Sequence, residues 1–182
     1  MTRNVIIPED ILENLELLTG MENEINGILP YRMATQGETT NCVVESSFFT
    51  GAGTGASVSR DPQRLKAINQ FLQENPEYRI IDFHTHPERL GSHWHQHFSD
   101  QDVKTFRDHL KDDPLYIGML VTPTHKIIWA PDKPELKTCP PLPKFMHEGL
   151  QRKIVEAAER IGIRLGEFNL GKFPEGRGES RR

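Results

Sequence analysis

Three side chains of types that bind divalent metals occur close together in this chain: His84, His86 and Asp102. The residues from Tyr78 to Phe83 are mostly β-branched or aromatic, which predicts a strand that ends at the histidines. Because side chains alternate between the faces of a strand, His84 and His86 should point the same way, about 6.6 Å apart along the backbone. Two imidazoles in that arrangement can converge on one ion, although a His-x-His pair alone also fits ordinary polar residues at a strand end.

Asp102 belongs to the segment Ser99-Asp100-Gln101-Asp102, which predicts the start of a helix. Ser99 and Asp102 occupy the cap and third positions of a capping box, so a purely structural cap would also explain them. A carboxylate at a helix start can nevertheless be directed back at the end of the preceding strand. Two neutral imidazoles and one carboxylate leave a tetrahedral Zn²⁺ with one position open for water, which is the composition of a catalytic zinc site.

Length and composition predict one compact domain over residues 1–170 and a flexible tail over 171–182. A chain of 182 residues can bury a real core, and its net charge of -4 gives no support for nucleic-acid binding. The two cysteines, Cys42 and Cys139, lack the Cys-x-x-Cys spacing of a thiolate zinc site and are too few for a disulfide scaffold. With no apolar run of the signal-peptide or membrane-helix type, we expect a cytoplasmic protein without membrane association.

Helices and strands alternate irregularly along the chain, which predicts an α/β (α+β) fold with a mixed central β-sheet flanked by helices. Apolar periodicity predicts helices over residues 8–18, 62–75, 102–111 (opened at the Ser99 cap) and 144–161. Strands are expected over 24–33, 41–49, 78–83, 115–121 and 126–129, with a short one over 163–168. The glycine-rich residues 50–55 and the proline-rich residues 132–143 are expected to be irregular connections.

These residues resemble the JAMM signature of the MPN (Mov34/JAB1) metalloproteases. The matching parts are His84-Thr85-His86-Pro87, Ser99-x-x-Asp102, and an earlier glutamate, Glu24. Glu24 opens the sequence Glu24-Ile25-Asn26-Gly27-Ile28-Leu29, which is similar to the family's Glu-x-x-Gly-Leu-Leu context, whereas Glu22 fits less well. The resemblance covers the chain from Glu24 to Trp129.

Membership of this family would imply the MPN/JAB1 fold, which has a cytidine-deaminase-like plan, and one catalytic Zn²⁺ held by His84, His86 and Asp102. Glu24 would be the general base, and Ser99 would help to stabilise the oxyanion. The implied substrate is the C-terminal Gly-Gly tail of ubiquitin or a ubiquitin-like modifier, joined to a lysine or to a short extension. The activity would be that of a deubiquitinase-like isopeptidase, similar to prokaryotic relatives of the proteasome-lid deubiquitinase.

Other interpretations of the same residues stay open. A JAMM hydrolase could process a sulfur-carrier protein or a small peptide, and an MPN domain could be a non-catalytic scaffold. A nucleoside deaminase is disfavoured because the His-x-Glu and Pro-Cys-x-x-Cys pattern is absent. The sequence leaves undecided whether the protein forms a homo-oligomer or a larger complex.

Twelve residues, 87–98, separate His86 from Ser99, five more than is usual in the family. This insertion could be a lid, or a recognition loop that uses Trp94 and Phe98. It also contains His93, His95 and His97, which are either solvated or a second, inhibitory metal site. Asp82, on the predicted strand, is either a hydrogen-bond partner for a ligand imidazole or a plain surface charge.

Overall fold

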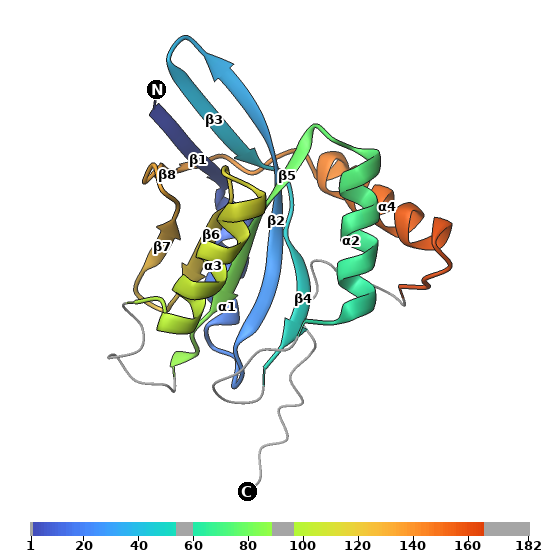
Figure 1. Ribbon diagram of the computed structural model, residues 1–182, viewed down its shortest axis with the longest axis horizontal. Helices are drawn as coiled ribbons and strands as arrows, with labels where there is room; N and C mark the ends of the chain where they lie inside the picture. The colour runs from blue at the N-terminus through green and yellow to red at the C-terminus, as the bar shows by residue number, and fades with distance from the viewer. Residues whose placement is uncertain (1, 54–59, 89–96, 166–182) are drawn as a thin grey trace, which may run out of the picture.

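The computed structural model describes residues 2–53, 60–88 and 97–165 (Figure 1). Within these residues strands and helices are interspersed along the chain, which confirms the expected α+β class. In chain order they are β1 (Thr2–Pro8), α1 (Glu9–Leu18), β2 (Ile25–Gln36), β3 (Thr39–Val44), β4 (Phe48–Ala52), α2 (Pro62–Glu74), β5 (Tyr78–Thr85), α3 (Asp100–Asp112), β6 (Ile117–Val121), β7 (Lys126–Trp129), β8 (Glu135–Cys139) and α4 (Lys144–Arg160).

The strands form one mixed sheet in the order β7-β6-β5-β2-β3-β1-β8. β2 pairs with β5 along one edge, and its other edge is shared by β3 and β4, which pair with opposite halves of it. β5 and β6 run parallel, as do β1 and its neighbours β3 and β8, and the remaining pairs are antiparallel. β5, the strand that carries His84 and leads directly into His86, therefore lies inside the sheet.

Helices cover both faces of the sheet (Figure 1). The register places Ile28, Asp82 and Gly118 opposite one another on three adjacent strands, so their side-chain positions share one face. On this face Ile28 and Phe48 pack with apolar residues of α2 and α4, among them Phe71 and Leu150. α1 packs on the other face, where Ile11, Leu15 and Leu18 join the core that contains Leu29, Ile81 and Met119.

Side chains cap both ends of α2. Asp61 accepts hydrogen bonds from the backbone N–H groups of Gln63 and Arg64 at 2.8 and 3.4 Å, and Pro62 stands at the first helical position. At the other end the Asn75 side chain donates to the Phe71 carbonyl at 2.9 Å. The expected helix over 144–161 is also confirmed as α4.

Three predicted segments differ from the structure. The irregular connection expected over 50–55 begins within β4, which continues to Ala52. The single strand expected over 41–49 is two strands, because the chain leaves the sheet at Glu45 and returns at Phe48 to pair with the other half of β2. The irregular connection expected over 132–143 contains β8, which pairs in parallel with β1. β1 itself was not predicted; it is held by pairing with β3 and β8, strands distant in sequence.

Several predictions concern segments outside the described residues. These are the second half of the glycine-rich stretch, most of the insertion after His86 and the tail from 171 onward. Of the short strand predicted over 163–168, only 163–165 are described, and they are not a strand. No helix among the described residues is long and apolar enough to cross a membrane.

Candidate metal centre

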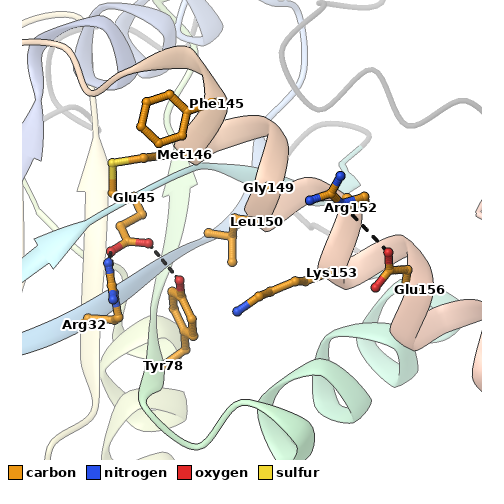
Figure 2. A pocket seen from close by; sticks show the side chains of 10 residues that line it. All are labelled: Arg32, Glu45, Tyr78, Phe145, Met146, Gly149, Leu150, Arg152, Lys153 and Glu156. Carbon is orange, nitrogen blue, oxygen red and sulfur yellow. Dashed lines mark hydrogen bonds and ion pairs between the residues drawn. The ribbon is translucent and has the colours of Figure 1, made fainter.

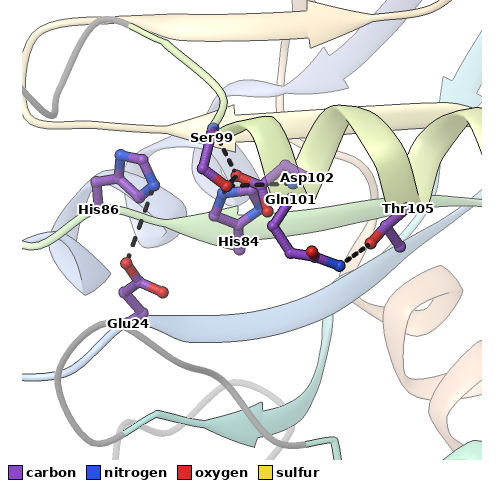
Figure 3. A network of polar contacts seen from close by, with 7 residues as sticks. All are labelled: Glu24, His84, His86, Ser99, Gln101, Asp102 and Thr105. Atoms are coloured by element: carbon purple, nitrogen blue, oxygen red, sulfur yellow. Dashed lines mark hydrogen bonds and ion pairs between the residues drawn. The ribbon is translucent and has the colours of Figure 1, made fainter.

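β5 brings the two histidines to one place. His84 is the last residue but one of β5, and His86 follows the strand directly, with its backbone N–H donating to the Val121 carbonyl of β6 at 3.0 Å. The extended backbone therefore continues through His86. The two imidazole centroids lie 5.2 Å apart, and both rings are on the same side of the strand, as predicted (Figure 3).

The start of α3 supplies the carboxylate. Ser99 caps the helix, its hydroxyl accepting from the Asp102 backbone N–H at 3.1 Å. Asp102 Oδ2 in turn accepts from the Ser99 backbone N–H at 2.8 Å and from the Ser99 hydroxyl at 2.6 Å (Figure 3). The predicted capping box is therefore formed, and it fixes the direction of the Asp102 carboxylate.

The strand end and the helix start meet. One ligand atom from each of His84, His86 and Asp102 lies within 4.8 Å of the other two. His84 Nε2 is buried and makes no hydrogen bond with a described residue, although Asp102 Oδ2 lies 3.5 Å away. A buried nitrogen lone pair beside another imidazole and a carboxylate is a donor set that suits Zn²⁺. The three residues could therefore hold one ion.

Glu24 lies next to this triad. It directly precedes β2, and its Oε1 is 3.9 Å from His86 Nε2 (Figure 3). Two backbone contacts hold it there: the Gly53 N–H donates to the Glu24 carbonyl at 2.8 Å, and the Ile25 N–H donates to Thr85 Oγ1 at 3.0 Å. Thr85 was not among the residues predicted to have a role in the site. Its position between the two histidines, on the opposite face of the strand, was the available signal.

The pKa of His84 is lowered to about 4. Burial is the main cause, because it disfavours the charged imidazolium, and nearby His86 and Arg60 act in the same direction. Asp102 opposes the shift. At neutral pH the imidazole is uncharged, which is the form that binds a metal.

Asp82 is buried, so the interpretation as a plain surface charge is wrong. Its side chain lies on the sheet face covered by α3, accepts a hydrogen bond from the Tyr116 hydroxyl at 2.8 Å and pairs with Arg60 at 3.2 Å. Burial and the nearby carboxylate raise the pKa of Tyr116 above its usual range. This network joins Arg60, two residues before α2, to β5 and to Tyr116, the residue before β6.

A row of aromatic rings extends from His84 to α3 and β7. The Phe98 ring is 6.0 Å from the His84 ring and 5.0 Å from that of Phe106, which lies in turn 5.2 Å from Trp129. Of the insertion's candidate residues, only Phe98 and the exposed His97 are described. Trp94, His93 and His95 lie outside the described residues.

Comparisons with known proteins support the fold alone. No protein-family model and no curated protein matches the chain. Among solved structures, the chain is similar to the solution structure of protein DSY2949 from Desulfitobacterium hafniense, a structural genomics target, with a TM-score of 0.51 and 18% sequence identity. The match covers 79% of this chain and 98% of that protein.

Proposed function

We propose that this chain is a zinc-dependent peptidase or isopeptidase of the JAMM type, with the MPN/JAB1 fold. Its proposed reaction is cleavage after the C-terminal Gly-Gly of ubiquitin or a ubiquitin-like modifier. The proposal is carried by one observation: ligand atoms of His84, His86 and Asp102 lie within 4.8 Å of one another, with the Glu24 carboxylate 3.9 Å from His86. A structural zinc site needs no further carboxylate, whereas hydrolysis needs a base beside the ion.

The residues divide the chemistry between them. When bound, Zn²⁺ would supply a Lewis acid that lowers the pKa of a coordinated water to about 7 and polarises a carbonyl. Glu24 takes the proton of the attacking water and returns it to the leaving amine. Its side chain is only 12% exposed, so bulk water has little access to the proton being transferred.

Ser99 has two tasks in this proposal. Its backbone N–H and hydroxyl both donate to Asp102 Oδ2 and hold the ligand carboxylate in place. To stabilise the oxyanion, the hydroxyl turns from Asp102 toward the substrate, while the backbone N–H keeps the carboxylate fixed. A hydrogen bond of this kind in the transition state is typically worth about 3 kcal/mol.

The surroundings of the triad favour a substrate with small residues. Phe98 lies beside His84, with ring centroids 6.0 Å apart, so a bulky side chain next to the scissile bond would meet this ring. Glycine would not. A Gly-Gly tail bound in extended form, through main-chain hydrogen bonds, satisfies this restriction.

The deciding experiment compares Glu24→Gln with the matched control Glu22→Gln, a nearby exposed glutamate outside the site. Bound zinc is measured by elemental analysis, and cleavage is measured on C-terminal fusions of ubiquitin and of a sulfur-carrier protein. We expect all three proteins to bind equal zinc. Glu24→Gln should lose at least about 100-fold in kcat/KM, as expected for losing a general base, and Glu22→Gln should retain activity.

Each of the other outcomes identifies the part of the proposal that is wrong. Normal cleavage by Glu24→Gln would show that the base is misassigned. Cleavage of the sulfur-carrier fusion alone would move the substrate class to the alternative JAMM hydrolase. A wild-type protein that binds zinc but cleaves neither fusion would favour the non-catalytic scaffold.

A further inference from the structure

A pocket of about 510 Å³ lies between α4 and the strand pair β2–β5 (Figure 2). Arg32, Glu45 and Tyr78 line it from the sheet side, and α4 contributes Phe145, Gly149 and Lys153 among others. Tyr78 and His84 stand near opposite ends of β5, about 20 Å apart along the strand. The pocket is therefore separate from the metal centre.

A buried carboxylate organises the floor of the pocket. Glu45 is 4% exposed, accepts from Arg32 Nε at 2.5 Å and accepts from the Tyr78 hydroxyl at 2.8 Å (Figure 2). A buried charge without partners would be strongly unfavourable, so these contacts are needed for the fold. They also hold the Arg32 guanidinium, whose side chain is 48% exposed, in one orientation at the pocket.

Two cations flank one aromatic ring. The guanidinium carbon of Arg32 lies 5.6 Å from the Tyr78 ring centroid, and Lys153 Nζ lies 5.5 Å from it. Lys153 Nζ lies 4.0 Å from the carboxylate of Glu77, and the Lys153 side chain is 47% exposed. Arg152 is a third lining cation, and it pairs with Glu156 at 3.9 Å, as Arg32 pairs with Glu45. Lys153 is therefore the one lining cation whose carboxylate neighbour, Glu77, stands outside the lining.

The wall formed by α4 is open and partly apolar. Phe145 is 71% exposed, and Leu150 is buried in the core cluster with Ile28 and Phe48. Gly149 lies inside α4, where glycine is less favourable than alanine, and a Cβ there would meet no described atom within 4 Å. Packing among the described residues does not require this glycine, and its missing side chain leaves space in the pocket.

We propose that this pocket binds a small anionic ligand. Its phosphate or carboxylate group contacts Arg32 and Lys153, and its apolar part packs against Phe145 and the gap at Gly149. The volume suits this class, because small-molecule sites typically enclose about 300–1,000 Å³ and combine apolar walls with a few placed polar groups. The inference goes beyond the proposed hydrolysis and does not depend on it.

The test is a titration of the ¹⁵N-labelled full chain followed by amide chemical shifts. Phenyl phosphate, benzoate and the neutral compound phenol are the probes. We expect at least one of the two anions to shift the amides of Gly149 and Lys153 saturably, and phenol to do so far more weakly. Tighter binding of phenyl phosphate would assign a phosphate ligand, and tighter binding of benzoate a carboxylate.

Variants on α4 distinguish ligand binding in the pocket from nonspecific attraction of anions to positive charge. Lys153→Met should weaken binding of the preferred anion about tenfold, as expected for one charge-assisted hydrogen bond. Lys144→Met is the matched control, since Lys144 is on the same helix, is 89% exposed and lies outside the pocket. Gly149→Ala should raise the thermal midpoint and still weaken binding, which a damaged fold could not do.

Three results would overturn the proposal: no saturable shift with either anion, equal binding of phenol and the anions, or equal affinities of Lys153→Met and Lys144→Met.

Discussion

Burial of His84 affects both the hydrogen bonding and the charge of its imidazole. Its Nε2 is buried without a hydrogen bond to any described residue, a state that typically costs about 1–3 kcal/mol. The same burial lowers the pKa of the ring and keeps it neutral. A cation bound at Nε2, as in the proposed metal site, would relieve this cost.

The metal-free protein should lose stability in mildly acidic solution because of His84. The folded pKa of His84 is about 4, below the ordinary 6.5, so the unfolded chain binds a proton that the folded chain does not. This contribution to stability is fully present above pH 6.5 and is lost as the pH falls toward 4. We expect a loss of about 3 kcal/mol. Urea unfolding in the presence of a chelator, at pH 7 and at pH 4, would measure it.

The control for this prediction is His84→Asn, which has no imidazole at that position. Its free energy of unfolding should fall less between pH 7 and pH 4. An equal fall in both proteins would show that other groups cause the acid sensitivity.

Ser99→Ala should affect stability and turnover separately. Loss of the cap should cost about 1 kcal/mol of unfolding free energy, and loss of the transition-state hydrogen bond should lower kcat about 100-fold or more. Ser99→Thr keeps a hydroxyl and should restore most of both. The measurements are urea unfolding and steady-state kinetics on a modifier fusion.

Asp61→Ala is the matched control, because Asp61 caps α2 through two backbone hydrogen bonds. It should cost similar stability and leave kcat unchanged. If it lowered kcat as much as Ser99→Ala does, the effect would come from helix capping in general.

At the scale of elements, the site depends on how α3 sits on the sheet. Phe106 of α3 packs over Gly118 of β6, where a Cβ would lie only 2.5 Å from the Phe106 ring. Tyr116 and Trp129 flank the same ring at 5.7 and 5.2 Å. The absence of a side chain at Gly118 therefore determines how close α3 lies to the sheet, and with it the position of Asp102.

Gly118→Ala should push α3 away from the sheet and weaken zinc binding. Overpacking of this kind typically costs about 1–3 kcal/mol. Phe106→Leu in the same chain should make room for the new methyl group and recover part of both losses. Calorimetric zinc titration and thermal unfolding of the two single variants and the double variant measure this coupling. Strictly additive effects of the two substitutions on zinc binding and stability would show that these residues do not determine the distance between α3 and the sheet.

At the scale of the whole molecule, metal binding should stabilise the entire fold. β5 lies inside the sheet, with Ile81 and Phe83 in the core on one face and Asp82 buried on the other. Unfolding the site therefore means unfolding the sheet.

Zinc at a thousandfold excess over its Kd should add about 4 kcal/mol to the free energy of unfolding. For a chain of this size that corresponds to a rise of about 10 °C in the thermal midpoint. Scanning calorimetry with zinc and with a chelator measures the difference, which His86→Ala should abolish. A midpoint unchanged by zinc in the wild type would contradict the metal site.

Some parts of the structure could not be predicted from local sequence. β8 lies in a proline-rich stretch, and β1 and β8 exist because they pair with each other, although they are more than a hundred residues apart. The break at Glu45 depends on Arg32 and Tyr78, which come from two other strands. Thr85 received no role because its partner, the Ile25 N–H, is sixty residues away. Contacts this distant leave no periodic pattern.

The sequence by itself determined the four helices, the strand that leads to His84 and His86, and the capping box of Ser99 and Asp102. These features depend on periodicity, proline geometry and hydrogen bonds within one turn, all of which are local. Only the tertiary structure decided that the strand end, the helix start and Glu24 meet, that Asp82 is buried, and that a charged pocket opens beside α4. Those facts follow from sheet register and helix packing, because both bring together residues that are distant in the chain.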